Sequence, residues 1–231
     1  MLRYYEYVSE AKVQMLFDQI PPKLLSKLAA EVDIDLKILG VSLQKAQTEA
    51  TLYSRLELVE EYLDRNYEIT WMTEPGSWFR GELNLRTATY QEVDGQVGGP
   101  LFMMGQADRT LVALIGSSHH RIGGRPQEAI GGYSTLPALF RLLRQEAPEE
   151  PLNVQGYAPD YEAEESAAVM YDVMVFARHL LGRPPPGFEA ALPCEFLARR
   201  LLRGTATDPR GTGDRVDVVV GTPLYVAQRD D

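Results

Sequence analysis

The chain has 231 residues, of which 45% are hydrophobic and 24% charged, and 33 acidic against 23 basic residues give a formal net charge of −10. This composition is ordinary for a globular protein, and the negative charge repels nucleic acids and anionic membranes, so we expect neither among its partners. No stretch approaches the roughly 20 consecutive apolar residues of a transmembrane helix, and the start lacks the pattern of a secretory signal. Together with a single cysteine, Cys194, which allows no intramolecular disulfide, these features predict a cytoplasmic protein.

The first forty residues predict short, alternating elements. Residues 3–9 are rich in tyrosine and predict a strand, and residues 10–20 have the apolar spacing of a helix that the two prolines at 21–22 end. A second helix is expected from Pro22 or Lys23, and residues 32–41 alternate as a short strand does.

The middle of the chain combines long helices with paired strands. Residues 48–66 predict a helix with one apolar stripe, formed by Leu52, Leu56, Val59 and Leu63. Residues 78–91 alternate as a strand with one wet face, and residues 101–106 and 110–116 predict a hairpin whose second, wholly apolar strand is central. Residues 161–181 predict another long helix.

The end of the chain is less regular. A proline-rich connector at 182–187 precedes residues 194–204, which fit a helix or a strand, and residues 215–227 predict a final strand. The fold class that we expect is α+β, with an antiparallel or mixed sheet packed by two or more long helices. We expect residues 1–231 to form a single domain.

Three stretches carry a family resemblance: RYYEYVSEAKVQML at the start, VALIGSSHH in the middle and VVVGTPLYVA at the end. They resemble an uncharacterised actinobacterial family of unknown function, with a YYxYxSxxKV opening and a closing strand like GTPLYVA. The resemblance spans nearly the whole chain, which favours one domain. It implies no activity, cofactor or catalytic residue.

The segment ALIGSSHHRIGG, residues 113–124, concentrates the polar chemistry of the chain. Loops after buried strands commonly hold functional groups, and here Ser118 would be a nucleophile with His119 or His120 as general acid or base. Ser118 lacks the GxSxG pattern of a serine hydrolase, and the alternative is an ordinary turn. The neighbouring residues Ser117, Arg121 and Arg125 are candidates for holding an anionic substrate or ligand.

Metal and nucleotide motifs are not readable in the sequence. His119, His120 and His179 show neither HxH nor HExxH spacing, so we predict no metal site. The glycines after Arg121 match neither nucleotide-binding fingerprint and are explained equally well as turn residues. The identity of any cofactor stays open.

Two further regions contribute candidate ligand-binding residues. Lys12 and the tyrosines of the first strand would line a pocket, although such a strand is more often structural. Thr222 and Tyr225 are expected at the rim of the sheet, because Pro223 marks an edge or a bulge. If the last strand lies beside residues 110–116, the polar segments after both strands line one common opening.

The function that we predict is non-catalytic binding of a small molecule or a protein partner, because no nucleophile, base and orienting partner can be read as a set. The alternative is an enzyme with a pocket at residues 117–120, in which a histidine acts as general acid or base on an anionic substrate. A structural or assembly component is a third class, and the sequence does not indicate the oligomeric state.

Overall fold

A computed structural model describes residues 3–31, 34, 45–89, 99–123, 173–174, 190–207 and 214–229. The helices in these ranges are α1 (Glu10–Phe17), α2 (Pro22–Glu31), α3 (Lys45–Asn66) and the 3-10 helix η2 (Ser118–His120). The strands are β1 (Tyr4–Val8), β2 (Ile69–Trp71), β3 (Trp78–Thr89), β4 (Pro100–Ala107), β5 (Thr110–Ser117), β6 (Leu192–Thr207) and β7 (Arg215–Gln228).

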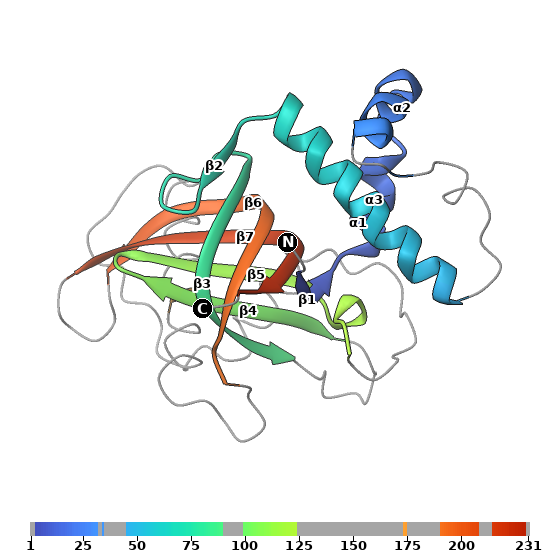
Figure 1. Cartoon of the computed structure of the whole chain (residues 1–231). Helices are drawn as coiled ribbons and strands as arrows, with labels where there is room; N and C mark the ends of the chain where they lie inside the picture. The colour runs from blue at the N-terminus through green and yellow to red at the C-terminus, as the bar shows by residue number, and fades with distance from the viewer. Residues whose placement is uncertain are drawn as a thin grey trace.

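The strands form one mixed sheet that closes on itself (Figure 1). Strand β7 pairs with β6 along one edge, and β6 pairs with β3. Strand β3 continues to β4, β4 to β5, and β5 returns to the other edge of β7 in parallel. Strand β1 is added to β7 beyond β5, and the short strand β2 is added to β3.

The interior of this closed sheet is apolar because every strand of the ring turns alternate residues inward. Along β3, Leu83 and Leu85 are buried whereas Glu82 and Asn84 are exposed, which confirms the alternation predicted for this strand. The inward cluster includes Phe79, Leu83, Leu85, Met103, Val112, Leu114, Phe196, Ala198, Val219 and Val226. The predicted hairpin is also confirmed, since β4 and β5 pair from end to end and β5 lies between β4 and β7.

The helices cover part of the outer face, on one side of the sheet (Figure 1). Leu56, Val59 and Leu63 of the predicted stripe are buried in a cluster that also contains Leu197 of β6 and Leu224 of β7. The stripe of α3 therefore packs on the outside of the closed sheet, as helix amphipathicity requires.

The expected fold class is wrong in one respect: the sheet is not packed by two or more long helices. In the described ranges only α3, with 22 residues, is long, whereas α1 and α2 have 8 and 10 residues. Strands dominate because the closed sheet buries its inner face against itself, so a long helix is needed on only part of its outside. The ambiguous segment 194–204 belongs to β6, a strand of 16 residues.

Most residues of two predicted elements lie outside the described ranges. Only Ile34 is described from the short strand expected at 32–41, and only Val173 and Met174 from the helix expected at 161–181. Val173 and Met174 are helical and buried against outward residues of the sheet such as Val218.

Candidate functional site

Strand β7 changes its partner in the middle of one edge. Its parallel pairing with β5 runs to Gly221, and its antiparallel pairing with β1 begins at Tyr225. Between these points β7 bulges at Leu224, whose carbonyl accepts a hydrogen bond from the Ser9 N–H at 2.9 Å. Pro223 has no N–H to leave unpaired, which explains why this strand tolerates a proline.

The segment that follows β5 lies at this change of partner. Strands β5 and β7 are parallel, so Ser117 at the end of β5 and Thr222 after Gly221 lie at the same end of the sheet. This is the strand arrangement that a common opening of the two segments requires. Ser118 to His120 then form η2, and the His119 N–H donates to Ser117 Oγ at 3.3 Å. We call the region formed by Lys12, Ser117–His120 and Thr222 the β5–β1 junction.

Tyr7 of β1 packs beneath the junction. Its side chain is 1% exposed, and a Cβ added to Gly116 would lie 2.6 Å from Tyr7 Oη, so the ring packs directly on the backbone of β5. The ring of His120 meets the Tyr7 ring edge-on at a centroid distance of 6.0 Å. Burial raises the pKa of Tyr7 to about 12, which keeps the phenol neutral at pH 7.

Lys12 reaches the junction from the first turn of α1. Its Nζ donates to the Pro223 carbonyl oxygen at 2.9 Å, and this is its only hydrogen bond to the described residues. Burial lowers the pKa of Lys12 to about 8, because the ammonium has lost much of its hydration. The amine is therefore a mostly protonated but weakly compensated cation at pH 7.

His120 is half-buried, whereas His119 is exposed. Burial lowers the pKa of His120 to about 4, and the neighbouring His119 and Lys12 add to the shift. His120 is therefore neutral at pH 7, and its ring lies 5.4 Å from the ring of His119.

Thr222 brings a buried hydroxyl to the same region. It is 7% exposed, and its Oγ1 has no hydrogen-bond partner among the residues that the structure describes. An unpaired buried hydroxyl is unfavourable by about 1–3 kcal/mol, so such a group is uncommon without a reason.

The other candidate residues are placed differently. Arg121 forms an isolated bridge with Tyr7 next to η2, whereas Arg125 lies outside the described residues. The hydroxyl of Tyr225 donates to Glu60 Oε1 at 3.0 Å, so it belongs to a second polar cluster, between α3 and the sheet.

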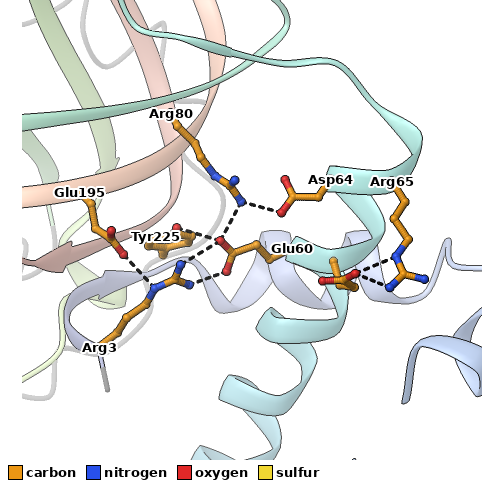
Figure 2. A network of polar contacts seen from close by, with 8 residues as sticks. Arg3, Glu60, Asp64, Arg65, Arg80, Glu195 and Tyr225 are labelled. Carbon is orange, nitrogen blue, oxygen red and sulfur yellow. Dashed lines mark hydrogen bonds and ion pairs between the residues drawn. The ribbon is translucent and has the colours of Figure 1, made fainter. Parts of the chain in front are cut away.

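This second cluster is an ionic network around Glu60 (Figure 2). Arg3 Nη1 donates to Glu60 Oε2 at 2.6 Å, and Arg80 Nη2 donates to Glu60 Oε1 at 2.9 Å. Arg3 Nε also meets Glu195 at 2.8 Å, and Arg80 meets Asp64 at 2.9 Å. Each arginine therefore has two carboxylate partners, and we call these five residues with Tyr225 the Glu60 network.

Sequence reasoning missed the Glu60 network and gave Tyr7 only a generic lining role. One signal for Glu60 was present: it lies four residues after Leu56 and three before Leu63, at the border of the apolar stripe of α3. A carboxylate in that place is buried by the same packing that buries the stripe, and it needs cationic partners. Nothing local indicated that Arg3 and Arg80 supply them.

Other classes of site find no support in the described ranges. They hold no group of three or more His, Cys, Asp or Glu side chains suited to a metal ion. No helix in that part of the chain is long and apolar enough to cross a membrane.

Comparison with known proteins identifies a family but no characterised relative. No curated protein and no solved structure matches the chain. A model described as a family of unknown function (DUF7019) matches residues 3–230, nearly the whole chain and all of the elements above. The expectation of a family of unknown function is thereby confirmed, whereas the match tests neither the actinobacterial origin nor the two motifs, and the chain belongs to this family of unknown function, DUF7019.

Proposed function

We propose that the protein binds a small molecule at the β5–β1 junction and that it does so without catalysing a reaction. The observation that carries this proposal is the pairing of a polar turn, η2, with the half-buried Lys12 and the buried Thr222, whose hydrogen bonds the described residues leave incomplete. Lys12 meets a single carbonyl oxygen, and Thr222 Oγ1 meets none of the described groups. Buried polar groups of this kind are most readily explained by a ligand that completes their hydrogen bonds.

The electrostatics of His120 favour binding over catalysis. An efficient general base has a pKa near the working pH, whereas the His120 pKa of about 4 leaves the imidazole neutral and weakly basic at pH 7. A carboxylate that orients a catalytic histidine would raise its pKa, but the charges that shift His120 are those of His119 and Lys12. We therefore prefer a ligand-contacting role for His120 to the role of acid or base.

The wider setting of the proposal follows from composition and from the family. The formal charge of −10 supports a protein that acts away from nucleic acids and anionic membranes, and one cysteine among 231 residues supports a cytoplasmic location. The family model, which spans residues 3–230 without a break, supports one domain.

A thermal-shift screen tests the binding site. The purified protein, His119→Ala and His120→Ala are heated with metals, nucleotides, sugar phosphates and lipids, and Arg109→Ala, at the opposite end of β5, is the control. A compound at about 100 times its Kd stabilises the folded state by about 2.7 kcal/mol, so the expected result is a rise in Tm of several degrees. That rise should persist in Arg109→Ala and shrink in a still-folded histidine variant.

Two results would contradict the proposal. One is a screen in which no compound raises the Tm of the wild type. The other is a stabilising compound whose effect is the same in the wild type and both histidine variants, because the ligand would then bind elsewhere. Turnover of a stabilising compound, lost in His120→Ala, would instead support the enzyme.

A further inference from the structure

Lys12 and Thr222 come from elements far apart in the chain, and Lys12 contacts the residue next to Thr222. Lys12 Nζ donates to the carbonyl of Pro223, and Thr222 is the residue directly before that proline. Consecutive Cα atoms are about 3.8 Å apart, so the ammonium and the hydroxyl belong to one small region.

The strand pairing also places both groups on the same face of the sheet. Thr222 pairs with Arg199 of β6, and paired residues of antiparallel strands point to the same side. Arg199 is two residues from Leu197, which packs in the helix-covered outer cluster together with Val13 of α1. The Thr222 side chain therefore points to the outer face of the sheet, on which α1, the helix that contains Lys12, packs.

The charge at this point is uncompensated among the described residues. Burial is the sole cause of the lowered Lys12 pKa, with no carboxylate raising it. The described titratable group on which Lys12 acts is His120 of η2, and both His120 and the Tyr7 ring that it meets are neutral at pH 7. A half-buried ammonium and a buried hydroxyl without a hydrogen-bond partner together have the chemistry of an anion subsite.

We propose that the β5–β1 junction binds an oxyanion, the carboxylate or phosphate group of a small molecule, between Lys12 Nζ and Thr222 Oγ1. The oxyanion supplies the negative charge that Lys12 lacks and accepts the hydrogen bond of Thr222. This inference rests on the proposed function and adds the chemical class of the ligand. His120, as a neutral imidazole, lies beside the subsite and contacts the rest of the ligand.

Nuclear magnetic resonance of lysine side chains gives a direct test on the full chain. The sequence contains five lysines, all among the first 45 residues, so a protein labelled with [13Cε]lysine gives a simple spectrum in which Lys12→Met identifies the Lys12 signal. The Lys12 pKa is measured in chloride, acetate and inorganic phosphate at equal ionic strength. Lys27, which is exposed on α2, is the internal reference, and Lys27→Met is the matched variant.

The expected result is a Lys12 titration near pH 8 in chloride and a rise of about one unit in saturating acetate or phosphate, which corresponds to tenfold tighter anion binding by the protonated amine. A rise in phosphate alone identifies a phosphate group as the ligand chemistry, and a rise in both anions includes carboxylates. Thr222→Val should lose most of the rise and Thr222→Ser should keep it. Both variants should unfold at nearly the wild-type temperature, since the hydroxyl has no described partner to lose.

An unchanged Lys12 pKa in all three anions would overturn the subsite, and so would a rise that Lys27 shares. A rise that Thr222→Val retains in full would overturn the role of Thr222. These failures can be distinguished from failure of the proposed function. If a neutral ligand stabilises the wild type but not His120→Ala, the junction is a binding site although it has no oxyanion subsite.

Discussion

The Glu60 network and the β5–β1 junction are both polar clusters between the helices and the sheet, yet they are satisfied to different degrees. In the network, Glu60 meets Arg3, Arg80 and Tyr225, and each arginine meets a second carboxylate (Figure 2). In the junction, Lys12 meets only a carbonyl among the described groups, and its effect on His120 is repulsive.

On this difference we propose a structural role for the Glu60 network and a binding role for the β5–β1 junction. In the Glu60 network each charged group has a partner of opposite sign, so the cluster holds α3 against the sheet, although Arg80 Nε has no hydrogen-bond partner among the described residues. A cluster with an uncompensated cation and an unpaired hydroxyl lowers the free energy of unfolding, and a ligand that pairs both groups would raise it again. Polar burial alone therefore does not identify a site.

The largest effect is expected when the Glu60 network is broken at its centre. Glu60→Gln removes the charge shared by Arg3 and Arg80, whose side chains are about a third exposed, and we expect a loss of about 2–4 kcal/mol of unfolding free energy. Urea unfolding at constant m-value measures the loss.

The matched control is Glu61→Gln, the next residue of α3. Glu61 pairs with Arg65 on an exposed face, so the loss should be small beside that of Glu60→Gln. Equal losses for the two variants would show that the network does not hold α3 more firmly than a surface ion pair does.

A smaller effect is expected from Gly116→Ala beneath the junction. The added methyl group would lie 2.6 Å from Tyr7 Oη and 2.7 Å from Tyr7 Cζ, so the buried ring must move. We expect a loss of about 1–3 kcal/mol in urea unfolding, as for overpacked cores.

A double-mutant cycle with Tyr7→Leu sharpens this prediction. Once the ring is removed, Gly116→Ala should add almost no further loss, and the cycle should give a favourable coupling energy. Strictly additive losses would show that Tyr7 is not the group that Gly116 accommodates.

The smallest effect concerns the titration of His120. The pKa of about 4 in the folded protein lies below the ordinary 6.5, so the unfolded chain binds the proton more readily. The stability contributed by neutral His120 is therefore complete above pH 6.5 and is lost as the pH falls toward 4. His120→Gln should unfold at nearly the wild-type urea concentration at pH 7 and should lose less stability than the wild type at pH 4.5.

Proton resonances of the imidazole ring check the same group directly. The sequence has three histidines, and the signal missing from His120→Gln should titrate near pH 4 in the wild type. Lys12→Met should raise that midpoint, because one of the repelling charges is gone. A wild-type midpoint at or above pH 6 would show that His120 is hydrated rather than buried beside Lys12.

The elements with a strong local pattern were predictable. The stripe on α3, the alternation of β3 and the hairpin of β4 and β5 follow from periodicity that one face of the core imposes. Segment 194–204 was ambiguous because its apolar and basic residues fit both periods, and the pairing of β6 with β3 and β7 makes it a strand. The expectation of a sheet packed by two or more long helices failed in the described ranges, because closure of the sheet leaves no local trace in the sequence.

For the candidate site, the sequence by itself determined which polar groups the chain possesses: the serines and histidines after β5, a lysine in the first helix, and a threonine before a proline in the last strand. Only the tertiary structure decided that they meet. Lys12 and Pro223 are separated by 211 positions, and Tyr225 and Glu60 by 165, so no periodicity relates them. The sheet closes around β7, and that closure gives every charge of one cluster a partner of opposite sign, whereas at the other the described residues offer no carboxylate to Lys12 and no hydrogen-bond partner to Thr222 Oγ1.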